Sequence, residues 1–469
     1  MNTDYKYLFK NIGLLTISNF TSKILTFLLV PLYTNVLTTE EYGTYDFYVV
    51  TALLLVPLLS VDIVDSILRF SLDKSNSAKE VFSIGFRIEL LAIVFCAILI
   101  IVNYNFGIIE ILNEYPVIFV FYYASIIFSD MMMQFTRGID KVKETAVAGI
   151  INSVTNISLN IYLLLFMHLG LYGFFYASII SMVTSAIYLF VSIKAWKYIS
   201  LTYINKQLRC DMVNYSAPLI FSNLSGWVNN LSSRYIIIWF CGTAVNGVFS
   251  AATKIPAILL VFQTIFSQAW TLSAVKTIDN QNKEFFKSVY GNYSFGLVLV
   301  CSLIIVFNKC ISSIIFGPDF YEAWQYAPFL LISVVFSSLT GFFVGVYSAL
   351  KRSKELAKTM TAGAVINVIL CILLTKGLGA VGAAIASLLS YISIWLFQLF
   401  KLSSSIDFRC FLPKDTLSYA ILLAQAVVMY FISNDLILYS LELLCFILLM
   451  IVNREQVKKY YLKFSSTKI

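Results

Sequence analysis

The stretch Leu90-Leu-Ala-Ile-Val-Phe-Cys-Ala-Ile-Leu-Ile-Ile-Val102 contains no polar or charged residue. A transmembrane β-strand alternates apolar and polar residues, so an unbroken apolar run predicts a membrane-spanning helix instead. Similar runs recur along the 469-residue chain, which is 59% hydrophobic and 12% charged and has a mean hydropathy of +0.83. Because ordinary soluble domains carry about 25% charged residues, most of this chain is expected to lie in lipid.

The amount of apolar sequence predicts the number of spans. About fourteen helices of about 20 residues would use roughly 280 residues, close to the hydrophobic share of the chain. The predicted fold is therefore an all-α polytopic membrane protein with about fourteen transmembrane helices. The predicted spans cover residues 12–37, 45–71, 82–105, 116–136, 146–168, 172–193, 215–240, 247–275, 286–308, 325–350, 358–375, 379–400, 416–433 and 437–453.

The distribution of basic residues tests this assignment, because short cytoplasmic loops collect Lys and Arg. With the N-terminus inside, only Lys309 and Lys376 of the 33 Lys and Arg residues fall in predicted outer loops. A missed helix would move every later loop to the other side and destroy the asymmetry. We therefore expect an even number of spans, with both termini in the cytoplasm and no cleaved signal peptide.

A weak internal repeat divides the predicted spans into two sets. The pattern LGxxGxxxAS begins at Leu169 and again at Leu378, and the segment 19–43 similarly matches 223–247. Small residues at this spacing also serve helix packing, but the matching order favours two six-helix lobes in the same orientation. The expected organisation is an N-terminal lobe over 1–193, a cytoplasmic linker over 194–214, a C-terminal lobe over 215–400, and helices 13 and 14 with a basic tail over 401–469.

Five basic residues fall inside predicted spans, where each costs about 3 kcal/mol or more unless it faces a cavity or a partner. They are Lys23, Arg69, Arg87, Arg234 and Lys254. Lys23 is near the middle of its span and shares a helical face with Asn19, and Asn223, Asn230 and Arg234 form a second polar face. Arg87 and Glu89 are near the inner end of their span, where snorkelling to the interface is the alternative. The set suits an anionic cargo.

Carboxylates inside predicted spans have two interpretations. Asp62, Asp65 and Arg69 share one helical face in an unbroken span 45–71, with Asp65 and Arg69 four residues apart. They either form a self-neutralising pair or take part in coupling to an ion gradient. Asp130, in the fourth span, is a further candidate for coupling or for pairing with one of the bases.

Other features have structural alternatives of equal weight. Tyr33, Tyr42, Tyr45 and Tyr48 gather at one membrane interface, where an aromatic belt is the commoner explanation and stacking on sugar rings the other. Prolines fall in the first two spans of each lobe, where they serve either as static kinks or as points of bending. They are Pro31, Pro57, Pro218 and Pro256.

Several function classes are excluded or disfavoured. The chain has no P-loop, GxSxG or HExxH motif, so no enzymatic activity is expected. The eight cysteines include no CxxC pair and His168 stands alone, so no metal site or cofactor is expected, although Cys241 and Cys310 could pair. The net charge of +8 comes from basic loops and not from a basic domain, so no nucleic-acid partner is expected.

The opening of the chain resembles the Wzx-type polysaccharide flippases. The resemblance is carried by Lys10-Asn-Ile-Gly, Asn19-Phe-Thr-Ser-Lys23 and Pro31-Leu-Tyr-Thr-Asn-Val-Leu-Thr-Thr-Glu40-Glu-Tyr-Gly43-Thr-Tyr-Asp46. The family belongs to the superfamily that also contains the multidrug and toxin extruders and the lipid II flippase MurJ. The resemblance implies flipping of an undecaprenyl-diphosphate-linked oligosaccharide across the bacterial inner membrane, with a polysaccharide polymerase and a chain-length regulator as further partners. It also associates a base in the first helix, here Lys23, with the diphosphate.

Two other functions remain open from the sequence. A drug or metabolite exporter of the same superfamily, coupled to a H⁺ or Na⁺ gradient, would use Asp62, Asp65 and Asp130. A non-transporting scaffold is disfavoured, because charges on polar stripes inside the membrane would then have no use.

Overall fold

The computed structural model describes residues 27–200, 205–278, 283–350, 352–403 and 405–458. These residues form helices and turns, and none of them lies in a β-strand. The chain divides into two compact units, with the division after Trp227. The predicted boundaries of the lobes and the linker remain predictions.

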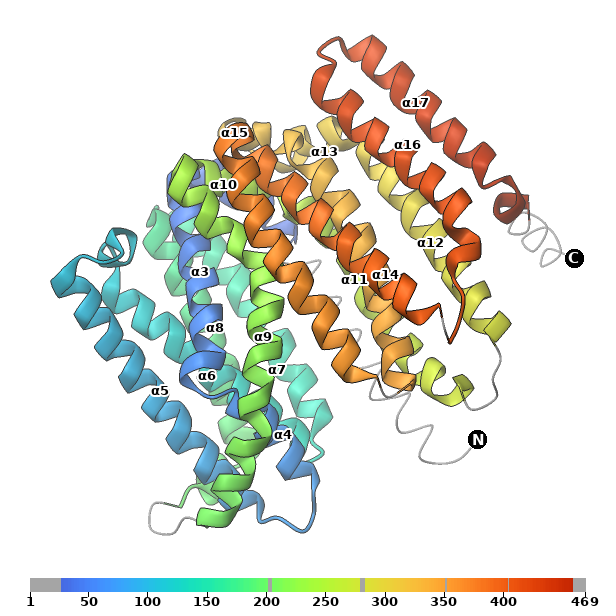
Figure 1. Cartoon of the computed structure of the whole chain (residues 1–469). Helices are drawn as coiled ribbons and strands as arrows, with labels where there is room; N and C mark the ends of the chain where they lie inside the picture. The colour runs from blue at the N-terminus through green and yellow to red at the C-terminus, as the bar shows by residue number, and fades with distance from the viewer. Residues whose placement is uncertain (1–26, 201–204, 279–282, 351, 404, 459–469) are drawn as a thin grey trace, which may run out of the picture. The chain divides into compact units, whose positions relative to one another are not determined.

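The first unit is a helical bundle (Figure 1). α6, α8 and the segment formed by α4 and α5 pack around a core that includes Phe82, Met131 and Leu189. Its helices are α2 (Val30–Val36), α3 (Thr39–Leu59), α4 (Ile63–Leu72), α5 (Ala78–Phe106), α6 (Pro116–Gly138), α7 (Val142–Asn160) with the π-helical η2 (Ile161–Phe166), α8 (Gly170–Ser192), and the first part of α9 (Lys206–Cys241).

The second unit is also a helical bundle, in which α14 packs against both α11 and α15. α16 and α17 pair with each other and contact α12. Its helices after α9 are α10 (Thr243–Ala252), α11 (Lys254–Ile278), α12 (Lys283–Val306), α13 (Asn308–Ile315), α14 (Ala327–Ala349), α15 (Ser353–Leu402), α16 (Leu412–Phe431) and α17 (Asp435–Val452).

The structure confirms a polytopic helical protein but not the number fourteen. Nine helices among the described residues are long and apolar enough to span a membrane, or ten if α10 and α11 form one bent span. α15 counts once, yet 50 residues of straight helix would be about 75 Å long, more than twice the apolar thickness of a bilayer. Its backbone breaks at Gly379, so it contains the two spans predicted over 358–375 and 379–400.

Both copies of LGxxGxxxAS lie at a break between two helices. Gly170 and Gly379, the first glycines of the two motifs, have φ angles of 50° and 60°, which favour glycine. A side chain on either second glycine would crowd its neighbours, and more severely at Gly382 than at Gly173. A Cβ on Gly173 would lie 3.2 Å from the Leu163 Cβ, and one on Gly382 would lie 2.2 Å from the Leu374 carbonyl oxygen. The motif therefore builds a tight helical hairpin in each unit.

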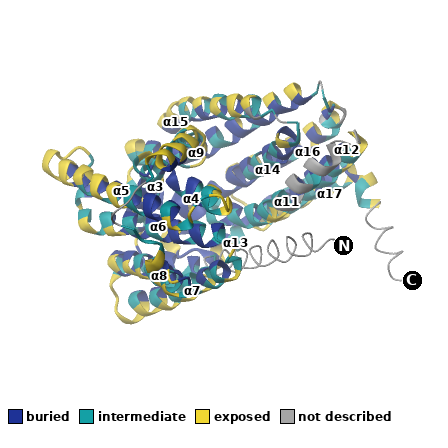
Figure 2. Cartoon of the chain, turned by 90° about the horizontal axis from the view of Figure 1, so that it is seen from below, coloured by how far each residue is buried: buried dark blue, intermediate teal, exposed yellow. Residues whose placement is uncertain are grey.

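The apolar surface agrees with a lipid environment. Along α5, Leu91, Phe95 and Ile101 expose more than half of their side-chain surface, and Figure 2 shows this exposed face. Leu436, Leu443 and Ile451 do the same along α17. Soluble proteins rarely expose large contiguous apolar patches. The chain is a multi-pass membrane protein.

The tyrosines near the start of α3 are packing residues. Tyr33, Tyr42 and Tyr48 are buried, and Tyr45 stacks on Phe174 with ring centroids 3.9 Å apart. The Tyr48 hydroxyl donates a hydrogen bond to the Ile111 carbonyl at 2.8 Å. Neither an exposed interfacial belt nor an open platform for sugar rings describes these side chains.

Candidate functional site

The second predicted span is broken, which changes the expected polar face. α3 begins at Thr39 and not at residue 45, because Thr38 and Glu41 form a capping box. The helix ends at Leu59, and α4 begins at Ile63. The prediction that Asp62 shares one continuous helical face with Asp65 and Arg69 was therefore wrong.

The break itself holds Asp62 in an unusual backbone conformation. Val61 and Asp62 have φ angles of 55° and 54°, and a β-branched residue rarely adopts this left-handed region. Such residues cost about 1–3 kcal/mol each and cluster at functional sites. The conformation places the Asp62 carboxylate at 2.5 Å from the Asn223 side-chain amide of α9, which donates a hydrogen bond to it. The structure thus brings together two predicted site residues.

The first part of α9 is fixed against this broken span by two further hydrogen bonds. The Ser66 hydroxyl donates to the Met212 carbonyl at 2.6 Å, and the Trp227 indole donates to the Val50 carbonyl at 2.9 Å. Asn223 lies between these two points along α9, and its own side chain is exposed. The Asp62–Asn223 pair therefore has firm support on both sides and one open face.

Four carboxylates of the first unit form an acidic group. Asp62 interacts electrostatically with Asp65, and Glu89 on α5 does so with both Asp62 and Asp130 of α6. Glu89 is only 3% exposed, and within the described residues neither of its carboxylate oxygens has a hydrogen-bond partner. The buried Tyr123 hydroxyl, which interacts with Glu89, also has none there. Buried polar groups of this kind call for a ligand, a water or a proton.

Glu89 is the member of this group that the sequence analysis missed. Its place near the predicted inner end of a span and its neighbour Arg87 suggested snorkelling. The structure separates the two residues: Glu89 is buried, whereas Arg87 donates a hydrogen bond from Nη2 to the Ser200 carbonyl at 2.8 Å. Residues two apart on a helix lie about 200° apart around its axis. The helical period therefore already placed Arg87 and Glu89 on different faces of the helix.

Arg69 and Arg87, the predicted bases of the first unit that the structure describes, form no ion pair with the acidic group. Among the described residues no ion pair links Asp65 to Arg69, so the self-neutralising pair, one of the two alternatives that the sequence left open, is not formed. Arg69 is exposed. The pKa of Asp73, beyond the end of α4, is lowered mainly by hydrogen bonds from Ser75 and to a smaller extent by the nearby Arg69 guanidinium. Lys23 and Asn19, the predicted centre of the cationic site, lie outside the described residues.

Two of the three residues of the predicted polar face of α9, Asn230 and Arg234, lie in the second unit, and Asn223 lies in the first. Arg234 is only 8% exposed, and its Nη1 donates a hydrogen bond to the Asn230 carbonyl at 2.7 Å. The guanidinium lies 5.6 Å from the centre of the Phe249 ring, a cation–π distance. The Tyr391 hydroxyl donates to the Asn230 side chain at 2.6 Å. A buried arginine held in this way can bind an anionic group.

Lys254 stands at a bend in the second unit. It begins α11, directly after Thr253, and α10 and α11 meet at an angle of 42°. Pro256 follows two residues later and cannot donate a backbone hydrogen bond to the preceding turn. The predicted span over 247–275 is therefore two helices, with a half-buried lysine at their junction.

A buried polar chain in the last helices was also missed. Glu442 of α17 is fully buried and accepts a hydrogen bond from the Gln425 side chain of α16 at 2.9 Å. Gln425 in turn accepts one from the Ser302 hydroxyl of α12 at 2.8 Å. Glu442 is the single charged residue within the apolar sequence 436–452, and that isolation was the available signal.

The second unit also contains an apolar groove between α11 and α12. Its volume is about 480 Å³, and Asn292 and Tyr293 are its polar lining residues. The other lining residues are Leu259, Phe262, Phe266, Val289, Gly296, Leu297 and Val300. A groove of this composition fits a hydrocarbon chain better than a sugar.

Polar and charged groups buried inside a helical membrane protein are typical of membrane transporters. The model of the family described as polysaccharide biosynthesis protein matches residues 8–271. Since this match covers more than half of the chain, the protein belongs to that family.

Two curated relatives are similar to part of the chain. A probable low-salt glycan biosynthesis flippase of Haloferax volcanii, Agl15, is 25% identical over 207 residues, which cover 42% of this chain and 43% of the relative. The uncharacterized membrane protein MJ1068 of Methanocaldococcus jannaschii is 24% identical over 208 residues, which cover 43% of this chain and 39% of the relative. The chain thus matches less than half of the length of either relative.

Solved structures share the fold over most of the chain. The lipid II flippase MurJ in an inward closed conformation has a TM-score of 0.69 at 16% identity, covering 94% of this chain and 99% of its own. An inward-facing multidrug resistance transporter of the MATE family, in the MOP superfamily, has a TM-score of 0.67 at 16% identity, covering 82% and 95%. The family match confirms the resemblance to proteins of polysaccharide biosynthesis, and the solved structures show that the fold is shared. The flippases and transporters named here agree with the expectation that the chain is not an enzyme.

Proposed function

We propose that this protein is a flippase that moves an undecaprenyl-diphosphate-linked oligosaccharide across the bacterial inner membrane. Membership of the polysaccharide biosynthesis family supports a glycan cargo, and the duplicated motif supports alternating access. The carrying observation is Arg234, a buried arginine on α9, inside the helical bundle of the second unit of a protein of this family. A cation in this position suits a lipid diphosphate.

In this proposal the diphosphate is bound by basic residues of each unit in turn. Lys23, with Arg69 or Arg87, engages it from the cytoplasmic side, and Arg234 or Lys254 receives it on the outer side. Asn19, Asn223 and Asn230 line the polar path. The isoprenoid tail stays in an apolar environment, and the groove between α11 and α12 is a suitable surface for part of it.

Coupling to a proton or sodium gradient is proposed for the acidic group of the first unit. Glu89 interacts electrostatically with Asp62 and Asp130, and Asp62 does so with Asp65. The oxygens of Glu89 have no hydrogen-bond partner within the described residues. Taking up and releasing a proton there would change the charge of the group. A polymerase and a chain-length regulator are proposed as partners that use the flipped product.

A transport assay tests the proposal on the purified full-length chain. Proteoliposomes containing a labelled undecaprenyl-diphosphate oligosaccharide are exposed to a membrane-impermeant glycosidase, and the rate at which inner-leaflet cargo becomes cleavable is measured. Wild type is expected to flip the cargo, and Arg234→Gln to slow it at least tenfold. Arg209→Gln removes an exposed arginine of the same helix and should match wild type. Equal rates for wild type and protein-free vesicles would contradict the proposal.

The acidic group also favours a second candidate, a cation-coupled exporter of drugs or metabolites. Four neighbouring carboxylates can bind a cationic compound. Expression of the chain in a drug-sensitive host separates the candidates, because an exporter of cationic drugs raises resistance and a glycan flippase leaves it unchanged.

A further inference from the structure

Glu442 of α17 is a buried carboxylate that the proposed flippase site does not use. It lies within a helix of 18 residues that is long and apolar enough to span a membrane, and none of its surface is exposed. Its Oε2 accepts the hydrogen bond from the Gln425 amide at 2.9 Å. Its Oε1 has no hydrogen-bond partner among the described residues. A buried polar atom in this state calls for a ligand, a water or a proton.

The described parts of the helices around Glu442 give it no counter-charge. α17 contacts α16 and α12, which contribute the side chains of Gln425 and, behind it, Ser302. Glu442 takes part in none of the ion pairs of the described residues. On α17 itself the nearby titratable groups are Cys445, which interacts electrostatically with Glu442, and Tyr439. An ionised Glu442 would therefore be a buried charge without a cation, which is costly inside a membrane protein.

The available oxygen atoms favour a proton over a metal ion. The described residues contain no group of three His, Cys, Asp or Glu side chains that could hold a metal ion. The Gln425 oxygen already accepts the Ser302 hydroxyl at 2.8 Å, so Oε1 of Glu442 is the unpartnered oxygen at the end of this polar chain. Hard metal cations take about six oxygen ligands, whereas a proton needs one.

Polar residues connect Glu442 to the predicted outer end of α17. Asp435, Tyr439 and Glu442 are spaced by four and three residues, so they share one side of the helix. Lys309, which is predicted in an outer loop, lies 3.2 Å from Asp435, and 74% of the Asp435 side chain is exposed. The outer end of this row is therefore open to water.

An apolar layer closes the opposite direction. Leu422 of α16 and Leu449 of α17 are fully buried. Along the two helices they lie between Glu442 and the next polar contact, a hydrogen bond from the Asn453 amide to the Ser418 hydroxyl at 3.1 Å. A proton thus has a shorter polar route to Glu442 from the predicted outer end.

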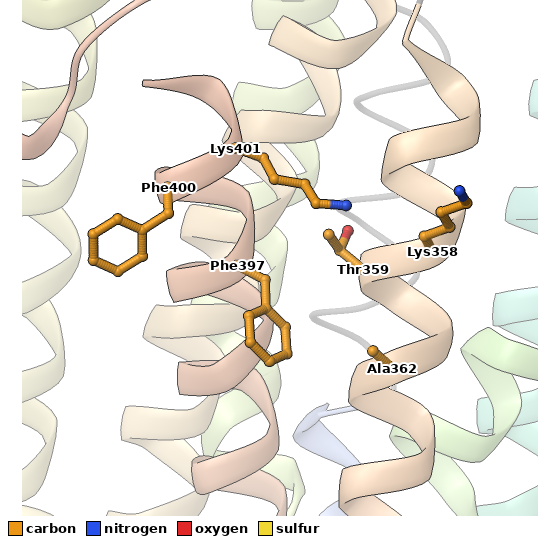
Figure 3. Close-up of a pocket in the computed structure, with 6 residues that line it drawn as sticks. All are labelled: Lys358, Thr359, Ala362, Phe397, Phe400 and Lys401. Atoms are coloured by element: carbon orange, nitrogen blue, oxygen red, sulfur yellow. The ribbon is translucent and has the colours of Figure 1, made fainter. Parts of the chain in front are cut away.

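The pocket between the two halves of α15, with a volume of about 320 Å³, offers no comparable group (Figure 3). The Lys358 ammonium turns away from it, and Lys401 takes part in another interaction. The Thr359 hydroxyl donates to the Leu356 carbonyl at 2.8 Å. Among the described residues, the unpartnered oxygen of Glu442 therefore makes the stronger site.

We propose that Glu442 is a proton-binding site of the second unit, separate from the acidic group of the first, and that it exchanges its proton with the predicted outer side past Tyr439. The proton binds to Oε1, while the Gln425 amide holds Oε2. When the proton leaves, it passes to water at the outer side and the carboxyl group becomes an anion. Its loss and return switch a charge on and off among α12, α16 and α17.

Infrared difference spectroscopy of the full-length protein in detergent tests this inference. At neutral pH a protonated Glu442 gives a C=O stretching band that a carboxylate lacks, and this band should be lost in Glu442→Gln. Glu442→Asp keeps a carboxyl group and should shift the band in frequency, which tests the site even if the amide variant does not fold. Glu455→Gln removes an exposed carboxyl group after the end of α17 and should leave the band unchanged. Equal C=O absorbance in wild type, Glu442→Gln and Glu442→Asp would overturn the site.

Two further arms test the route and the ligand. Transfer to D₂O shifts the band as the proton is exchanged, and Tyr439→Phe should slow this exchange about tenfold, the rate change expected for one lost hydrogen bond. Tyr430→Phe removes a hydroxyl of similar exposure, 38% against 37%, from α16 and should match wild type.

The outcomes of these arms are distinct. Equal exchange in Tyr439→Phe and wild type would overturn the outer route. Loss of the band when sodium chloride replaces choline chloride would overturn the assignment to a proton in favour of a sodium ion. None of these results depends on flippase activity.

Discussion

Individual residues decide what this membrane protein can bind. Arg234 is buried within the second unit and Glu89 within the first, and their surroundings differ. Arg234 has a carbonyl and an aromatic ring as partners, whereas the described residues give the oxygens of Glu89 no hydrogen bond. The first suits the binding of an anion, and the second suits a change of protonation.

Glu89→Gln tests the coupling role at the residue scale. The amide keeps the shape of the side chain but cannot ionise. The factor by which a pH gradient accelerates transport should therefore fall at least about tenfold. Flipping without a gradient should continue. The measurement is the proteoliposome rate with and without an imposed gradient.

The control is Glu110→Gln, which neutralises an exposed carboxylate in the same unit. It should retain the full response. A wild-type gradient response in Glu89→Gln would remove Glu89 from the coupling proposal.

The elements are defined by a few positions at their ends. Sequence alone predicted separate helices over 358–375 and 379–400, and the backbone of α15 does break at Gly379. The sequence did not predict the break at residues 60–62. The left-handed backbone of Val61 and Asp62 accompanies a hydrogen bond to Asn223, which is 161 residues away in the chain.

A graded set of glycine substitutions tests the hairpins. Gly382→Ala would place a Cβ 2.2 Å from a backbone oxygen and should destabilise the protein by about 1–3 kcal/mol. Gly173→Ala, with contacts of 3.2–3.3 Å, should cost less. Gly377→Ala meets nothing within 4 Å and is the control. Thermal unfolding in detergent gives the order, and equal melting temperatures for all three would contradict this account of the motif.

The polar chain of α12, α16 and α17 makes a second element-scale prediction. Gln425→Leu would leave Glu442 and Ser302 without their shared partner, and should destabilise the protein by about 1–3 kcal/mol. Glu442→Gln can keep the contact with Gln425 and should cost less. Thermal unfolding of the two variants is the measurement. A larger loss in Glu442→Gln would show that the charge itself is required.

At the scale of the whole molecule, composition and helical period predicted the class of fold. They also predicted the Asn230–Arg234 face, because residues four apart lie on one side of a helix. The Asp62–Asn223 contact and the burial of Glu89 depend on which helices pack together, which the pattern of one sequence does not specify. The choice between the two alternatives for Asp65 depended on packing for the same reason: Arg69 is exposed and lies near Asp73.

The central claim, flipping of an anionic lipid-linked glycan by basic residues within the membrane, is tested most directly in cells. Surface polysaccharide is measured on a gel from a strain deleted for the gene and complemented with wild type, Lys23→Ala, Lys23→Arg or Lys10→Ala, with each variant's folded protein quantified. The account predicts loss in the deletion, rescue by wild type, Lys23→Arg and the loop control Lys10→Ala, and no rescue by folded Lys23→Ala. Unchanged polysaccharide in the deletion strain, or full rescue by Lys23→Ala, would contradict it.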